Sequence, residues 1–146
     1  MNLLLWRHAD AAPGHPDGLR PLTVLGQAQA SATARWITAR LDGPFRLLVS
    51  PALRTQQTAQ ALAHPIETAD ALSVGRSAQE VLEAAGWPDA RGTVIVVGHQ
   101  PTLGQIAALL LSGKEHEWPM ATSAACLISS EGEKPSLRAN YEPSGA

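Results

Sequence analysis

Short apolar runs that alternate with longer segments of helical period constrain the fold of this chain most. The clearest runs are Asn2–Trp6, Leu47–Val49 and Thr93–Val97. Such short, almost uninterrupted apolar runs are typical of strands in a parallel sheet that is covered on both faces. The alternation therefore predicts an α/β fold, a three-layer sandwich with a mostly parallel central sheet and helices on both faces.

Helix-capping residues and further apolar runs predict the remaining elements. Ser50 followed by Pro51 is typical of a helix N-cap and first helical residue, here for a helix that ends near Ala63. The other expected elements are a helix over Val24–Leu41 capped by Thr23, a strand over Ile66–Ala69, a helix that starts with a Ser77–Glu80 capping box and ends before Gly86, a helix over Leu103–Leu111, and a terminal hairpin or two edge strands over Ala124–Ser129 and Leu137–Tyr141.

Length and charge exclude several classes of protein. The chain has 146 residues, so we expect one domain over residues 1–146. Its 11 Lys and Arg against 13 Asp and Glu provide no broad cationic field, which disfavours nucleic acid as a partner. The longest apolar run, Ile106–Leu111, is far too short to span a membrane. Cys126 is the one cysteine, so no disulfide can form within the chain. The short apolar stretch at the start lacks the basic segment that precedes the apolar part of a secretory signal peptide. We therefore expect a cytoplasmic protein.

Ionisable side chains follow three predicted strands at the point where each strand ends. Arg7 and His8 follow the first strand, Arg54 lies just after the second, and His99 follows Thr93–Val97. Parallel strands end at one edge of a sheet, where ligands bind in such folds. Arginine offers a planar set of donors that matches phosphate oxygens, and histidine can act as a nucleophile near neutral pH. Four such groups would repel one another without an anion between them, so we predict a phosphate site at this edge.

The residues at these strand ends also carry a family resemblance. Leu5-Trp6-Arg7-His8-Ala9-Asp10 resembles the Arg-His-Gly signature of the histidine phosphatase superfamily, whose fold is called phosphoglycerate-mutase-like. The segments 50–58 and 96–101 are similar to its second arginine motif and its second histidine motif. The resemblance covers roughly residues 2 to 130, and within the superfamily the small size and the run Arg20-Pro21-Leu22-Thr23 are similar to the SixA-type phosphohistidine phosphatases. Ala9 departs from the signature, because the family has glycine there.

The resemblance implies a mechanism for the strand-end residues. His8 would be the nucleophile that forms a covalent phosphohistidine, Arg7, Arg54 and Arg20 would hold the phosphoryl oxygens, and His99 would stabilise the charge that grows on them. Neither a metal ion nor another cofactor would be required. Two assignments stay open at this point. Arg20 could instead form an ion pair with Asp17 or Asp10, and the general acid could be Asp10, Asp17 or no residue at all.

Three functions are compatible with this pattern. The first is a phosphatase of phosphohistidine in a protein, since the segments between Arg54 and His99 and after Leu111 are too short to form a lid over a small substrate. An imidazole leaving group can also be protonated near neutral pH, so it needs no strong acid. The second is a phosphatase of small phosphate esters or phosphorylated metabolites. The third is a module that binds phosphate or a phosphoprotein without turnover.

Overall fold

A computed structural model describes residues 1–145 as one six-stranded sheet between two layers of helices. The strand order is β3-β2-β4-β1-β5-β6. The strands are β1 (Asn2–Arg7), β2 (Phe45–Val49), β3 (Glu67–Thr68), β4 (Thr93–Gly98), β5 (Ala125–Ser129) and β6 (Ser136–Tyr141). The first four strands are parallel to one another, while β5 is antiparallel to both β1 and β6.

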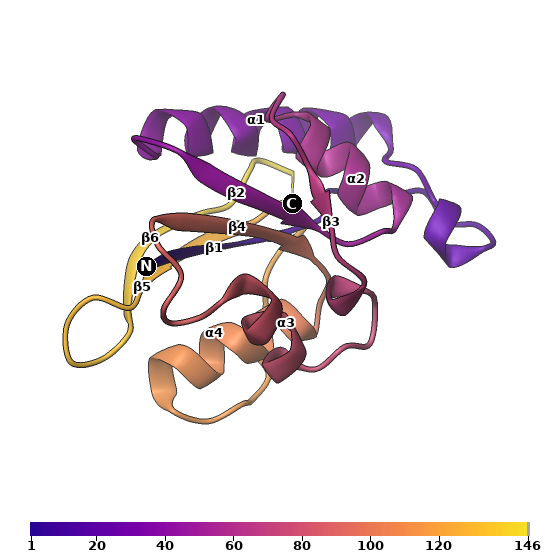
Figure 1. Cartoon of the computed structure of the whole chain (residues 1–146). Coiled ribbons are helices and arrows are strands. Elements are labelled where there is room, and N and C mark those ends of the chain that lie inside the picture. The colour runs from indigo at the N-terminus through magenta and orange to yellow at the C-terminus, as the bar shows by residue number, and fades with distance from the viewer. Residues whose placement is uncertain (146) are drawn as a thin grey trace.

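The helices lie on both faces of this sheet, as Figure 1 shows. One face carries α1 (Val24–Arg40) and α2 (Leu53–Gln60), and the other carries α3 (Ala78–Ala85) and α4 (Thr102–Ser112). Two short 3-10 turns, η1 (Asp17–Leu19) and η2 (Asp70–Leu72), lie in the connections. The predicted α/β sandwich with a mostly parallel sheet and helices on both faces is therefore confirmed.

The alternation of side chains along the strands builds a core on each face. In β1, Leu3 and Leu5 pack in the cluster that α3 and α4 cover, whereas Leu4 and Trp6 pack in the cluster that α1 covers. All four side chains are at most 1% exposed. Because successive residues of a strand point to opposite faces, a strand buried on both sides must be apolar throughout. This requirement explains why β1 and β4 were recognisable in the sequence.

Local sequence signals fix most helix ends, with one exception. Thr23 accepts a hydrogen bond from Gly26 N–H at the start of α1, and Ser77 forms the predicted capping box with Glu80. The prediction for Ser50 is wrong, because α2 begins at Leu53 with Ala52 as its N-cap, and it ends at Gln60 rather than near Ala63. The hydroxyl of Ser50 instead accepts a bond from Ala52 N–H (3.3 Å) and contacts His99, so a tertiary partner replaces the helix cap.

The remaining sequence predictions differ from the structure only in extent. The expected strand over Ile66–Ala69 is reduced to the two residues of β3, while β5 and β6 form the expected antiparallel pair. Within residues 1–145 no helix is both long enough and apolar enough to cross a membrane.

Candidate active site

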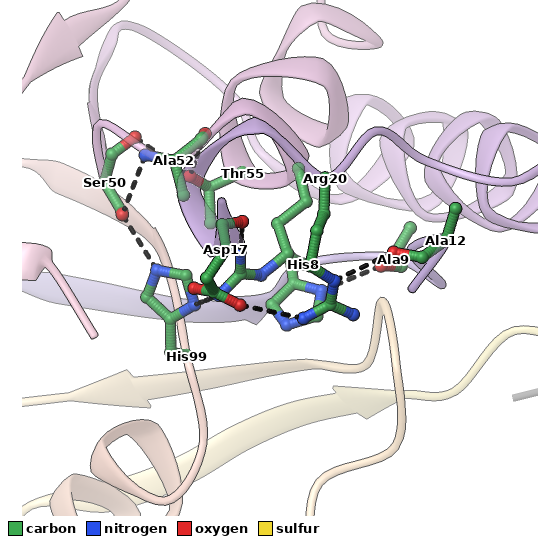
Figure 2. Close-up of polar contacts among 10 residues, drawn as sticks. His8, Ala9, Ala12, Asp17, Arg20, Ser50, Ala52, Thr55 and His99 are labelled. Carbon is green, nitrogen blue, oxygen red and sulfur yellow. Dashed lines mark hydrogen bonds and ion pairs between the residues drawn. The ribbon is translucent and has the colours of Figure 1, made fainter. Parts of the chain in front are cut away.

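The ends of β1, β2 and β4 meet at one edge of the sheet, where the ionisable residues gather. The register pairs Arg7 with Gly98 and Val49 with Val97, so the residues that follow these strands lie next to one another. The ring centroids of His8 and His99 are 5.5 Å apart. Figure 2 shows both rings together with Ser50, Asp17 and Arg20. The structure thus brings together His8, His99, Arg7 and Arg54, as the sequence predicts, and places Arg20 beside them.

The backbone of His8 is held from two sides. Its N–H donates to the carbonyl oxygen of Gly98 (3.1 Å), and its own carbonyl accepts from Ser123 N–H (3.1 Å). The side chain of the same Ser123 accepts from the indole N–H of Trp6 (3.1 Å). These bonds join the end of β1 to β4 and to the loop before β5. The position of the imidazole is therefore fixed by the sheet rather than by a flexible loop.

The His8 ring has a defined tautomer. Its Nδ1 lies 2.8 Å from the carbonyl oxygen of Ala9. A carbonyl oxygen can only accept, so Nδ1 carries the proton and donates it to this bond. In a neutral ring, the lone pair is then on Nε2. His8 consequently presents a nucleophilic nitrogen, held in place by the bond on the other side of the ring.

Both histidines are kept neutral by their surroundings. Burial lowers the pKa of His8 to about 4, and the charges of Arg54, Arg7 and Arg20 act in the same direction, although the bond to the Ala9 carbonyl opposes them. Burial also lowers the pKa of His99 to about 3, again with a contribution from Arg54. The sequence indicated the direction of the His8 shift through the neighbouring positive charges. In the structure, the loss of solvation is the larger cause.

Arg7 and Arg54 each have a buried donor that is not used within the protein. Arg7 donates from Nη1 to the carbonyl oxygen of Met120 (2.8 Å), and burial lowers the pKa of this guanidinium. Arg54 is 4% exposed and donates from Nη1 to the Asp17 carbonyl (2.9 Å). Among the described residues, the buried side-chain polar atoms without a hydrogen-bond partner are Arg7 Nε and Arg54 Nε. An unpaired buried N–H costs about 1–3 kcal/mol, so two of them on charged groups suit an oxyanion.

Arg20 reaches the site through Asp17. Its Nη1 lies 3.0 Å from Asp17 Oδ1, and its Nε donates to the carbonyl oxygen of Ala12 (2.8 Å). The other carboxylate oxygen, Asp17 Oδ2, lies 3.1 Å from Arg54 Nη2. The ion pair with Asp17, which the sequence left open for Arg20, is therefore present. Asp17 connects the two arginines, and the phosphate-binding role of Arg20 stays a prediction.

His99 is held between Arg54 and Ser50. Arg54 Nη2 lies 3.4 Å from Nδ1 of His99, and Ser50 Oγ lies 2.8 Å from Nε2. A guanidinium can only donate, so Nδ1 is the acceptor and Nε2 donates its proton to Ser50. His99 is 4% exposed. If His99 gains a proton when a dianion enters the site, the new N–H lies on Nδ1, on the Arg54 side of the ring.

The two candidate acids differ in their surroundings. Hydrogen bonds from Arg20 and Arg54 lower the pKa of the Asp17 carboxyl, so it is ionised at neutral pH and cannot donate a proton. Asp10 Oδ2 accepts from the hydroxyl of Thr23 (2.6 Å), which ties Asp10 to the start of α1. Of the two candidates, Asp17 is therefore unsuitable as a general acid, and Asp10 is engaged in structure.

Ala9 replaces the glycine of the family signature without strain. The described residues other than glycine with positive φ are Ala63 and Ser123, so Ala9 lies outside the left-handed region. Its side chain is fully buried, and its N–H donates to the hydroxyl of Thr58 (3.0 Å). The substitution therefore leaves the turn after His8 intact.

Other nucleophilic or metal-binding groups lie elsewhere or are not grouped. Cys126 lies on β5 in the core, and burial raises the pKa of its thiol to about 11, so the thiol stays protonated. Over residues 1–145, no three side chains of His, Cys, Asp or Glu lie close enough together to hold a metal ion.

Two contributors to the site were not identified from the sequence. Ser50 was interpreted as a helix cap, although it follows the end of β2 in the same way that His8 and His99 follow their strands. Its position at a strand end was the signal that could have identified it. Met120 contributes only a backbone carbonyl, to Arg7, and no sequence pattern marks such a contact.

Comparisons with known proteins agree with this site. A family model described as the histidine phosphatase superfamily (branch 1) matches residues 3–74, which include His8 and Arg54. The phosphohistidine phosphatase SixA of Escherichia coli (strain K12) is 30% identical over 140 residues, which cover 86% of this chain and 82% of that protein. An uncharacterised protein of Picosynechococcus sp. is 36% identical over 129 residues, which cover 78% of this chain and 75% of that protein.

A solved structure has the same fold over almost the whole chain. It is the protein histidine phosphatase SixA complexed with tungstate, with a TM-score of 0.82 and 27% identity, and the alignment covers 96% of each chain. The expected phosphoglycerate-mutase-like architecture is thereby confirmed.

Proposed function

Because this chain belongs to the histidine phosphatase superfamily, we propose that it is a phosphatase that works through a covalent phosphohistidine on His8. One observation carries the proposal: the His8 ring holds its proton on Nδ1 against the Ala9 carbonyl, which leaves the Nε2 lone pair for attack. The unpaired Nε donors of Arg7 and Arg54 supply the complementary site for the phosphoryl oxygens.

The reaction has two steps. In the first, Nε2 of His8 forms a bond to phosphorus while the bond from phosphorus to the leaving group breaks, and the leaving group takes a proton from water. In the second, water attacks phosphorus, the bond to Nε2 breaks, and inorganic phosphate leaves with neutral His8 restored. Arg7 and Arg54 neutralise the phosphoryl oxygens in both steps, while neutral His99, whose ring centroid lies 5.5 Å from that of His8, completes the wall of the site.

We propose phosphohistidine in a protein as the substrate. The SixA relative bears the name of a phosphohistidine phosphatase. The Asp17 carboxylate beside the arginines cannot act as a strong acid, and an imidazole leaving group does not need one. Leu19 and Val74 are 65% and 54% exposed, and both lie close to the site on η1 and on the loop after η2. They offer apolar contact to the protein that carries the phosphoryl group. A cytoplasmic location stays part of this proposal.

The test is phosphoenzyme trapping with a phosphohistidine-bearing protein domain. Wild-type protein mixed briefly with labelled substrate should hold acid-labile, base-stable phosphate. His8→Ala should hold none and should release no phosphate, while its folded state persists because His8 lies at the sheet edge. The matched control is His116→Ala, which removes an exposed histidine and should behave like wild type.

The other two functions correspond to other outcomes of the same experiment. Label on Cys126 or on a serine would overturn the mechanism. Comparable kcat/KM on a sugar phosphate would make small phosphate esters the substrate class. Binding of phosphate without any release from the substrate would show a non-catalytic module.

A further inference from the structure

A cavity of about 300 Å³ adjoins the site on its solvent side. Its walls include Pro51, Ala52, Ser73 and Val74, and Asp17 lies at its border with the arginines. Asp17 is the one charged residue among its lining residues. A ligand group that occupies this cavity therefore meets largely apolar walls, the hydroxyls of Ser50 and Ser73, and the Asp17 carboxylate, which is paired with Arg20 and Arg54.

The position of Asp17 is fixed by polar contacts of both its carboxylate and its backbone carbonyl. Its two carboxylate oxygens bind Arg20 (3.0 Å) and Arg54 (3.1 Å), and its backbone carbonyl accepts from Arg54 Nη1 (2.9 Å). The Asp17 side chain is 58% exposed, whereas that of Arg54 is 4% exposed. The carboxylate thus lies outward of Arg54, and Figure 2 shows the contact that it makes with Arg20.

The charge of Asp17 acts differently on the two parts of a substrate. In the proposed reaction the phosphoryl oxygens bind the buried Nε donors of Arg7 and Arg54, which are unpaired in the protein and compensate the charge of these oxygens. An in-line displacement expels the leaving group opposite the attacking Nε2 of His8, and the cavity bordered by Asp17 and Ser50 offers space beside the site to receive it. A leaving group that is protonated and positively charged before it departs is attracted there, and one that carries its own negative charge is repelled.

We propose that Asp17 is a specificity-determining residue that favours phosphoramidates, whose leaving group is protonated, over phosphate esters that carry an additional negative charge. This inference rests on the proposed phosphatase function and deepens it. Asp17 transfers no proton itself. The leaving ring takes its proton from water before the bond between phosphorus and nitrogen breaks, and the carboxylate attracts the positive charge of this protonated ring. When the bond breaks, its electron pair stays on the ring nitrogen and the ring departs as neutral imidazole.

The test uses Asp17→Asn with two small probes. Asparagine keeps the size of the side chain and one acceptor oxygen but removes the charge. We expect kcat/KM for phosphoimidazole to fall roughly tenfold in this variant. The anionic ester 3-phosphoglycerate, tested as an inhibitor of phosphoimidazole turnover, should bind more tightly, with an inhibition constant roughly tenfold lower. Asp70→Asn removes an equal charge from the exposed turn η2 and should change neither value.

The combination of these two changes separates the charge effect from other roles. If Asp17 only positions Arg54, both probes bind or react less well in the variant. If it only competes with phosphate for Arg54, both improve. Either of these patterns, or no change in the two values, overturns the inference. The proposed function is then unaffected, provided that the wild-type protein turns over phosphoimidazole. A wild-type protein that forms no phosphoenzyme from phosphoimidazole or from the phosphohistidine-bearing protein domain overturns the proposed function, and this inference with it.

Discussion

A change from pH 7 to pH 5 should destabilise the folded protein through His8 and His99. Both rings are buried without a proton, with pKa values of about 4 and about 3 against an ordinary value of 6.5. In the unfolded chain each ring takes up a proton as the pH falls below 6.5, while the folded chain takes up almost none until about pH 4. The unfolded state binds more protons throughout this range, so the free energy of unfolding must fall as the pH falls.

The size of the effect follows from these pKa values. For a group that titrates at 6.5 in the unfolded chain and near 4 in the folded one, the loss between pH 7 and pH 5 is about 2 kcal/mol. His99 contributes a similar amount. Domains of this kind are stable by only about 5–15 kcal/mol, so a combined loss near 4 kcal/mol is readily measured.

Urea unfolding at pH 7 and at pH 5 measures this loss directly. His8→Asn should lose about 2 kcal/mol less than wild type over the same pH interval, because one of the two rings is gone. His116→Asn removes an exposed histidine and should show the wild-type loss. An equal loss in wild type and His8→Asn would refute the reasoning, since it would mean that His8 is accessible to protons in the folded state.

Three further changes test the rest of the site. Arg54→Lys should lower kcat/KM by the equivalent of about 2–5 kcal/mol, because a lysine cannot supply Nε and both terminal nitrogens at once. Steady-state kinetics that show full activity would place Arg54 outside the site. Ser50→Ala should lower kcat roughly tenfold by removing the acceptor that fixes the His99 tautomer, with little change in far-UV circular dichroism, and an unchanged kcat would contradict this role. Gly26→Ala should destabilise the fold by about 3 kcal/mol or more, since an added Cβ would overlap the carbonyl oxygen of Asp10. A thermal unfolding midpoint equal to that of wild type would contradict this prediction and would mean that the backbone moves to make room for the methyl group.

The strands and the strand-end residues were predictable for a physical reason. A strand buried on both faces has no polar positions, so β1 and β4 are visible as apolar runs, and the ends of parallel strands necessarily share an edge. These two facts are sufficient to group Arg7, His8 and His99. Arg54 required one more assumption, that the segment after β2 is helical, and the structure places it as the second residue of α2.

The contacts of the long loop after β1 were not predictable in the same way. Asp17 binds Arg54 across 37 positions of sequence, and no periodicity or capping signal specifies such a contact. Ser50 illustrates the opposite case, a strong local signal that a tertiary contact overrides, since its hydroxyl is used by His99 and the helix starts later. The dominance of burial in the His8 pKa also depends on packing that the sequence does not reveal.

The directions of the strands have a practical consequence for experiments that attach the protein to a support. The antiparallel pairing of Tyr141 with Ala125, together with the bond from Arg7 N–H to the Ala124 carbonyl oxygen, brings the end of β6 to the edge of the sheet that holds the candidate active site. Met1 lies at the opposite edge, where its backbone bonds Ser130. A linker, fluorophore or biotin joined ahead of Met1 therefore leaves the approach to His8 open, whereas the same group attached at the end of β6 lies at the edge where the proposed protein substrate binds.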